Sequence, residues 1–312
     1  MRRLTPPTKF TAAILAVALL AAYSARPALA QDQAPPPPQA EAPPPPPDQG
    51  PPPPSYSPDQ LDQMVSRIAL YPDPLLAQVL AAATFPDQIP DAARWADDHH
   101  YLRGQDLASA ITADHLWWDP SVQALLPFPS VLAMMASDMD WTTNLGDAFL
   151  AQRQDVMDAV QRMRQKAKDY GYLRSNDQIV VSGGPYIEID PVDPAFICVP
   201  VYNPLIVFAP PRPGFFVGGA IAFGFGIDIG VAFRPWGWGV VRFDWGRHAL
   251  FINNVPWGRR WDNRRVYVHP YPEVHRWARG NRVEGHRLIR RSPAERRAPR
   301  EGRPRPEERH HR

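Results

Sequence analysis

The sequence predicts an α+β fold, in which an all-α region comes first and a small β region rich in glycine and tryptophan follows. Over residues 57–172, apolar side chains recur at helical spacing between prolines that fit helix starts. Over residues 176–270, short β-branched runs alternate with turns of Gly, Pro and Asp. Residues 236–277 hold six of the ten tryptophans. We therefore expect a helical domain over 57–172 and a β-rich region over 176–270.

Capping residues and prolines mark the expected helix starts. Ser57 precedes Pro58, and Gln60 follows three residues after the serine, which predicts an N-cap with a capping box. Tyr71-Pro72 is expected to end this first helix, because proline cannot continue it. Further helices are expected to begin at Asp73, Asp119 and Pro129.

The longest predicted helix runs from about residue 140 to 170. Its apolar positions fall on one helical face, and Gly171 provides a C-terminal stop because glycine readily adopts positive φ. The apolar face consists of Trp141, Leu145, Ala148, Phe149, Val156, Val160, Met163 and Ala167.

Strands are predicted in the second half of the chain. The runs are β-branched and are separated by Gly-Gly-Pro and Asp-Pro-Val-Asp-Pro turns. They cover residues 178–181, 186–189, 195–202 and 248–253. Pro200 and Pro204 suit the edge or the end of a strand, because proline cannot donate to a strand ladder.

Residues 215–233 allow two interpretations. Large side chains occupy the odd positions and mostly Gly and Ala the even ones, which favours β structure with a hairpin or a bend at a glycine. The alternative is a membrane helix over 214–233, with glycines at the spacing of close helix packing. Asp228 in mid-span counts against the membrane helix.

The first thirty residues predict an export signal. Arg2, Arg3 and Lys9 precede an apolar core over 10–22, and Ala28-Leu29-Ala30 fits a cleavage site. We expect the mature chain to begin after Ala30 and to be periplasmic or extracellular. Cys198 is the only cysteine, so no intramolecular disulfide is expected.

Both ends of the mature chain are predicted to be disordered. Residues 31–56 form a proline-rich linker of polyproline II character, with fourteen prolines between positions 34 and 58. Residues 271–312 form an Arg- and Pro-rich basic tail with few apolar residues. Residues 276–312 carry a net charge of +8 with His neutral, whereas residues 31–258 carry −12. The chain is thus an acidic body with a basic tail.

Several uncommon sequence motifs follow one another along the chain. They are LYPDPLLAQVL from Leu70, WDPSVQALLPFPSVLAMM from Trp118, DWTTNLGDAFLAQRQDVMDAVQRMR from Asp140 and, more weakly, VPVYNP from Val199. In these motifs the chain resembles a secreted bacterial family, domain of unknown function 3300 (DUF3300). The resemblance covers about half of the chain. The family has no assigned activity, so the resemblance implies export but no chemistry.

Residues of catalytic or metal-binding type have simpler explanations. His99 and His100 are candidate metal ligands, but adjacent helical residues point in different directions, and a polar helix end explains them as well. Cys198 lies in an apolar strand, which favours a buried thiol. Asp138/Asp140 fit a helix N-cap and Asp190/Asp193 fit a turn. We expect no cofactor.

Two groups of side chains are candidates for polymer binding. Arginines of the tail could bind an anionic polymer, and exposed tryptophan rings could stack on sugars. The candidates are Arg287, Arg290, Arg291, Arg296, Arg297, Trp236, Trp238 and Trp257. The alternatives are a solvated tail and tryptophans that only cover a small β core.

We therefore expect a non-enzymatic binding or scaffolding protein of the cell envelope. Its partners would be anionic envelope polymers or an envelope protein, with peripheral membrane or wall association, and no nucleic acid because the chain is exported. One alternative is an envelope hydrolase that uses carboxylates or His99 and His100. Another is a membrane protein anchored by residues 214–233.

Overall fold

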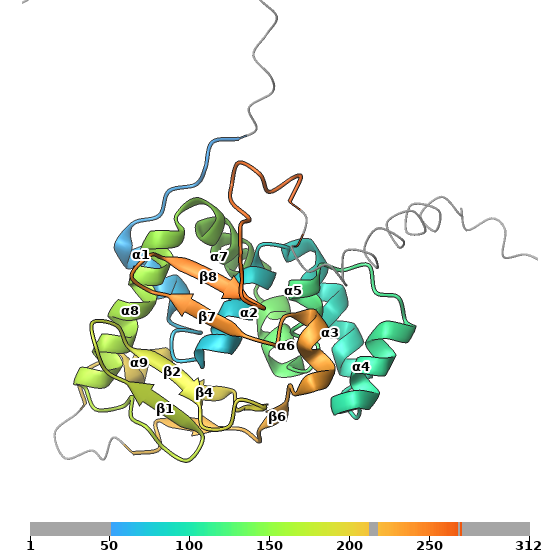
Figure 1. The fold of residues 1–312 in the computed structure, drawn as a ribbon. Helices are drawn as coiled ribbons and strands as arrows, with labels where there is room; N and C mark the ends of the chain where they lie inside the picture. Colours follow the sequence, from blue (N-terminus) through green and yellow to red (C-terminus); the bar gives the residue numbers. More distant parts are fainter. Residues whose placement is uncertain (1–50, 212–217, 268, 270–312) are drawn as a thin grey trace, which may run out of the picture. The chain divides into compact units, whose positions relative to one another are not determined.

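A computed structural model describes residues 51–211, 218–267 and 269 (Figure 1). These residues belong to one compact unit. The predicted signal, most of the proline-rich linker and the predicted tail lie outside the described residues. The predicted α+β class is confirmed, because helices dominate the first half of the unit and short antiparallel strands the second.

Between residues 58 and 169 the chain forms helices that are joined by turns and short loops. The α-helices of this part are α1 (Pro58–Val65), α2 (Asp73–Ala83), α3 (Ile89–Asp98), α4 (Gly104–Ala113), α5 (Pro120–Gln123), α6 (Pro129–Ser137), α7 (Met139–Ala151) and α8 (Arg153–Asp169). A 3-10 turn, η1 (Pro86–Gln88), precedes α3. Two further helical turns, α9 (Pro204–Val207) and η2 (Val231–Trp236), lie among the strands.

The predicted helix starts at Pro58, Asp73, Pro120 and Pro129 are confirmed, but α1 ends at Val65 and not at Tyr71-Pro72 as expected. Ser57 and Gln60 form the expected capping box of α1, in which each side chain accepts a hydrogen bond from the backbone N–H of the other. Asp119 caps α5 through the N–H of Ser121, and Asp138 caps α7 through the N–H of Trp141. Each cap satisfies a backbone donor that the helix itself leaves unpaired.

The single long helix predicted for residues 140–170 is wrong, because the chain forms two helices that meet at Gln152. Gln152 has φ −133° and ψ 45°, outside the helical region. Its carboxamide pairs with the backbone of Tyr56: Oε1 accepts from the N–H at 2.6 Å and Nε2 donates to the carbonyl at 3.2 Å. The apolar face continues across this break, so periodicity could not reveal it.

The predicted stop at Gly171 is confirmed. Gly171 has φ +77°. Its N–H donates to the carbonyl of Lys168, and the N–H of Tyr172 donates to the carbonyl of Ala167. This pair of bonds is a Schellman motif, which satisfies carbonyls at the end of α8.

The strands are short and antiparallel. They are β1 (Ile179–Ser182), β2 (Glu188–Pro191), β3 (Phe196–Ile197), β4 (Pro200–Tyr202), β5 (Ile221–Phe223), β6 (Ile227–Asp228), β7 (Val241–Asp244), β8 (Ala249–Ile252) and β9 (Val255–Pro256). In the described residues β1 pairs with β2, β3 with β6, β4 with β5, and β7, β8 and β9 form one sheet in that order. The four predicted strand regions all contain strands.

The period-two segment is only partly a strand. Residues 212–217 lie outside the described part, β5 and β6 are separated by Gly224–Gly226, and the two strands pair with β4 and β3 respectively. The prediction of a break at glycine is thus confirmed, whereas residues 231–233 form the start of η2 instead of a strand. Among the described residues no helix is long and apolar enough to cross a membrane.

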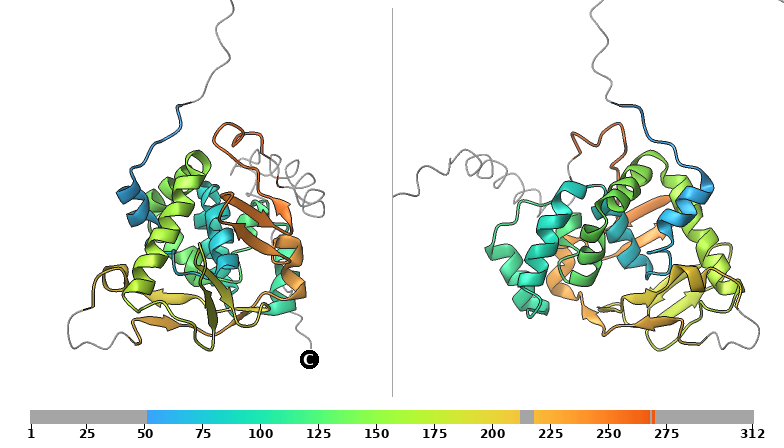
Figure 2. Two further views of the ribbon diagram at one scale, coloured as in Figure 1. Left: turned by 60° about the vertical axis from the view of Figure 1, so that its left-hand side comes forward. Right: turned by 180° about the vertical axis from the view of Figure 1, so that it is seen from behind.

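Helix α2 lies at the centre of the packing. It lies among α5, α7, β2 and β7 (Figures 1 and 2). Every residue of α2 except Pro74 is buried. An α-helix that is apolar all round needs burial on all sides. Its polar Gln78 donates to the carbonyl of Gly237 at 3.1 Å. The β region therefore completes the core of the helical region.

Arg164 of α8 is a fully buried cation. Its guanidinium donates to the carbonyls of Ala69 at 2.8 Å, Ile187 at 2.8 Å and Tyr71 at 3.1 Å, and contacts Asp73 Oδ1 at 2.6 Å. One side chain therefore joins α8, the turn before α2, the start of α2 and the approach to β2.

Asp73 extends this network into the second half of the chain. Its Oδ2 accepts from the indole N–H of Trp245 at 3.2 Å, and the Arg164 guanidinium lies 5.0 Å from the Trp245 ring centroid. Burial raises the pKa of the Asp73 carboxyl, and the neighbouring guanidinium opposes that rise.

Two further arginines, the half-buried Arg153 and the buried Arg259, anchor the end of the described chain. Arg153 donates to the carbonyl of Trp257 at 3.1 Å, and Arg259 donates to the carbonyl of Thr84 at 2.9 Å. Burial lowers the pKa of each guanidinium to about 10, so both stay charged at neutral pH. Backbone carbonyls, rather than carboxylates, thus provide most of their hydrogen-bond acceptors.

Replacing Arg164 with Leu is expected to cost about 3–5 kcal/mol of unfolding free energy, because it leaves a buried carboxylate without its counter-charge. Urea unfolding followed by circular dichroism measures this. Arg162→Leu on the same helix is the matched control: Arg162 is half-exposed, and its partner Asp62 keeps Lys166. The control should lose less than about 1 kcal/mol. Equal losses of unfolding free energy in the Arg164→Leu and Arg162→Leu proteins would show that the buried network contributes no more stability than a surface ion pair.

Gly146→Ala is expected to lower the melting temperature, although alanine favours helices by about 1 kcal/mol over glycine. A Cβ at Gly146 would overlap the carbonyl oxygen of Ala83 and lie 2.6 Å from its carbonyl carbon. Overpacking of this kind costs about 1–3 kcal/mol or more. Gly184→Ala, where the nearest atom lies 3.9 Å away, should leave the melting temperature nearly unchanged. A stabilised Gly146→Ala protein would contradict the close packing of α7 on α2.

Candidate binding groove

The two candidate metal ligands lie at the C-terminal end of α3. The His99 ring stacks on Trp95 with centroids 4.0 Å apart, and its Nε2 lies 4.0 Å from Asp114 Oδ2. The Nδ1 atoms of His99 and His100 face the carbonyls of Trp95 and Asp97 at 2.8 and 2.5 Å. In the described part of the chain, no cluster of three or more His, Cys, Asp or Glu could hold a metal ion.

The candidate tryptophans are core residues. Trp238 and Trp257 are 5% and 2% exposed, and the indole of Trp238 donates to the carbonyl of Ala124 at 2.9 Å. Trp236 is half-buried and donates to Gln123 Oε1 at 2.8 Å. A sugar could not stack on the buried rings of Trp238 and Trp257, so the structure supports the alternative that they cover the β region.

Cys198 lies between β3 and β4 and is half-buried. Burial raises the pKa of its thiol, which favours the neutral, unreactive form at neutral pH. Its Sγ lies near Gly226 on the opposite strand segment. The thiol therefore has the character of a packing group.

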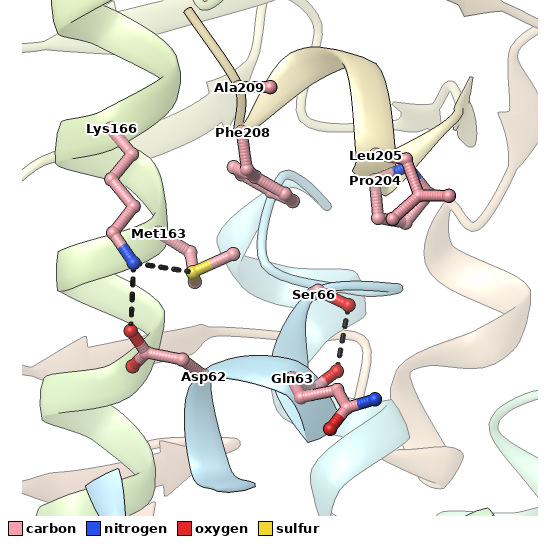
Figure 3. A pocket seen from close by; sticks show the side chains of 9 residues that line it. All are labelled: Asp62, Gln63, Ser66, Met163, Lys166, Pro204, Leu205, Phe208 and Ala209. Carbon is pink, nitrogen blue, oxygen red and sulfur yellow. Dashed lines mark hydrogen bonds and ion pairs between the residues drawn. The ribbon is translucent and has the colours of Figure 1, made fainter. Parts of the chain in front are cut away.

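A groove opens between α1, α8 and α9 (Figure 3). Its volume is about 310 Å³. The lining side chains are Asp62, Gln63 and Ser66 from α1 and the residue after it, Met163 and Lys166 from α8, and Pro204, Leu205, Phe208 and Ala209 from α9 and the residues after it. These residues come from three distant segments of the chain, and no sequence motif marked them as a site.

The short helix α9 forms the apolar wall of the groove. Asn203 Oδ1 accepts from the N–H of Leu205 at 2.9 Å, and Pro204 occupies the first helical turn, where it has no N–H to leave unpaired. Leu205 is 85% exposed and Ile206 50%, whereas Val207 is fully buried in the core. Asn203 and Pro204 are thus a helix start. The expectation that Pro204 lies at the edge or the end of a strand was wrong.

The opposite wall of the groove is charged. Asp62 Oδ1 contacts Arg162 Nη2 at 2.6 Å, and Asp62 Oδ2 contacts Lys166 Nζ at 3.0 Å. Of these three groups only Asp62 and Lys166 line the groove, so their formal charges balance within its lining. Figure 3 shows Lys166 and Asp62 joined beside Met163, opposite Phe208.

The groove therefore combines an apolar wall with a charged one that holds an ion pair. Leu205 exposes apolar surface that burial would stabilise by about 1.5–3 kcal/mol. The Asp62–Lys166 pair presents polar groups on the other side. This arrangement suits an amphipathic ligand and has no nucleophile–base pair.

Comparison with known proteins gives the family but no activity. A family model described as "Protein of unknown function (DUF3300)" matches residues 57–279. The chain belongs to the DUF3300 family. The resemblance noted in the sequence is thereby confirmed. The match covers all of the groove and the buried Arg164 network.

A curated relative is likewise without an assigned function. This DUF3300 chain is 34% identical over 223 residues to the "Uncharacterized protein YacH" of Escherichia coli (strain K12). The alignment covers 57% of this chain and 36% of YacH, so the chain spans about a third of that relative's length. No solved structure matches this chain.

Proposed function

We propose that this DUF3300 protein is an exported, non-enzymatic binding protein of the cell envelope, and that its groove holds an apolar peptide segment of an envelope protein. The exposure of Leu205 on α9 carries the proposal, because it presents a large apolar side chain beside a hollow. The Asp62–Lys166 ion pair on the facing wall favours a segment that carries polar groups near its apolar residues.

The sequence of the leader supports export. A basic start, an apolar core over 10–22 and Ala28-Leu29-Ala30 have the order of a secretory signal. The proline-rich residues 31–56 would then hold the folded unit away from its point of attachment.

The arginine tail is the second proposed contact with the envelope. The candidate residues Arg287, Arg290, Arg291, Arg296 and Arg297 lie outside the described residues. Their charge is opposite to that of residues 31–258 and fits an anionic wall or outer-membrane polymer. Binding of this kind weakens as salt screens the charges.

Leu205→Asp is expected to weaken binding to native outer-membrane vesicles by about tenfold or more, because it replaces buried apolar contact with a charge. Co-sedimentation of the mature protein measures this. Val266→Asp, a change at another exposed apolar side chain far from the groove in sequence, is the matched control and should bind like the parent.

Vesicles of the same lipids without protein separate a protein ligand of the groove from a lipid ligand. A protein in which the five candidate tail arginines are replaced with Gln, so that the tail contributes less, is expected not to sediment with these vesicles above background at moderate salt. Equal sedimentation with protein-free vesicles would identify a lipid ligand and would overturn the assignment to a protein segment.

Replacing the five candidate tail arginines with Gln is expected to reduce the salt-sensitive part of binding to sacculi or outer-membrane vesicles, since the net charge of residues 276–312 falls from +8 to +3. Co-sedimentation over a salt series measures this reduction. The five-Gln protein should bind more weakly than the parent at low salt and show a shallower salt dependence. A tail variant that keeps the parent's salt dependence would rule out the tail as the polymer contact.

A further inference from the structure

The last residues of the proline-rich linker have a defined path on the folded unit. Pro51 to Tyr56 run as an extended chain into α1, seen as the blue trace in Figure 1. Four consecutive prolines fix φ and disfavour helix, which leaves polyproline II as the favoured conformation. That conformation has no internal hydrogen bonds, so its carbonyls are free to accept from a neighbouring surface.

Gln152 holds one end of this segment. Its carboxamide makes both backbone hydrogen bonds of Tyr56, at 2.6 and 3.2 Å, as a neighbouring strand would. The phenol of Tyr56 donates to Asn144 Oδ1 at 3.2 Å, and its ring packs against the core. The same contacts hold Gln152 outside the helical conformation between α7 and α8.

Trp261 holds the other end. Its indole N–H donates to the carbonyl of Pro51 at 3.2 Å. Its own backbone N–H donates to the carbonyl of Leu150 at 3.1 Å, which fixes it beside Gln152 at the end of α7. The Arg264 guanidinium covers the indole at 3.7 Å from the ring centroid. The indole is therefore positioned before it meets the proline carbonyl.

The segment is buried mainly at its C-terminal end. Pro54 and Tyr56 are half-buried, whereas Pro51, Pro52 and Pro53 are exposed. Polyproline II has three residues per turn, so Pro51 and Pro54 lie on one side of the chain. An aromatic side chain that donates to a proline carbonyl is a general feature of surfaces that recognise this conformation.

We propose that Asn144, Gln152 and Trp261 form a recognition site for a polyproline II segment followed by an aromatic residue, and that its ligand is this chain's own Pro51–Tyr56. The site fastens the linker to the folded unit at a fixed point. This inference is independent of the groove between α1, α8 and α9.

The sequence explains why this proline run is selected. The linker contains three runs, over residues 35–38, 43–47 and 51–54. The first is followed by Gln-Ala and the second by Asp-Gln, whereas the third is followed by Ser-Tyr. Only the third run offers an aromatic ring at the position that Asn144 and the core contact. Tyr56 therefore sets the register.

Distance measurements between two spin labels test the site in the full mature chain. The labels are placed at Pro53→Cys and Asp98→Cys, both exposed, with Cys198→Ser to remove the native thiol. The parent should give a narrow distance distribution by electron–electron double resonance. Adding Gln152→Glu and Trp261→Phe should abolish the narrow component, since both remove hydrogen-bond donors to the segment.

Gln105→Glu with Trp117→Phe is the matched control, because both side chains are exposed and lie away from the segment in sequence. It should keep the narrow component. A narrow component that persists without Gln152 and Trp261, or that is missing from the parent, overturns the proposal.

A competitor peptide provides a second measurement that does not depend on the folding of any site variant. Pro-Pro-Pro-Pro-Ser-Tyr, added to the labelled parent at millimolar concentration to match a tethered ligand, should displace the segment and remove the narrow component. The same peptide with Ala in place of Tyr should displace the segment much less. Equal effects of the two peptides, or no displacement by the first, would contradict recognition of the aromatic residue.

Discussion

The structure depends on the burial of one charged side chain. Arg164 satisfies three backbone carbonyls and Asp73 from the middle of the core, and Asp73 in turn accepts from Trp245. A buried cation is tolerated only when its donors are matched, so each partner must be in place. The network thereby couples helices of the first half of the chain to strands of the second.

This coupling explains why a small Gly- and Trp-rich region is ordered without disulfides. Its strands are short, and isolated strand pairs are marginal in water. They are stabilised because Trp238, Trp245 and Trp257 bury their rings in the same core as α2. The opposite, solvent-facing side of α8 is then free for other contacts, and Lys166 there forms the charged wall of the groove.

The sequence predicted most helices and strands, but it predicted neither of the two proposed binding surfaces. Ser57, Asp119 and Gly171 have their expected capping roles because caps depend on a few neighbouring residues. The groove joins α1 to α9, and the linker site joins Tyr56 to Gln152 and Trp261. Such sites arise from residues about one hundred or more positions apart, which spacing rules do not connect.

The sequence alone determined the α+β class, the helix starts at Pro58, Asp73, Pro120 and Pro129, the stop at Gly171, the break at glycine near residue 224 and, through its motifs, the DUF3300 family. Tertiary structure alone decided that residues 140–170 form two helices, that the tryptophans serve the core, and where ligands could bind. The physical reason is the sequence separation over which each kind of interaction acts. Capping and periodicity act over a few residues, whereas the conformation of Gln152 and the burial of Arg164 depend on partners supplied by distant segments of the chain.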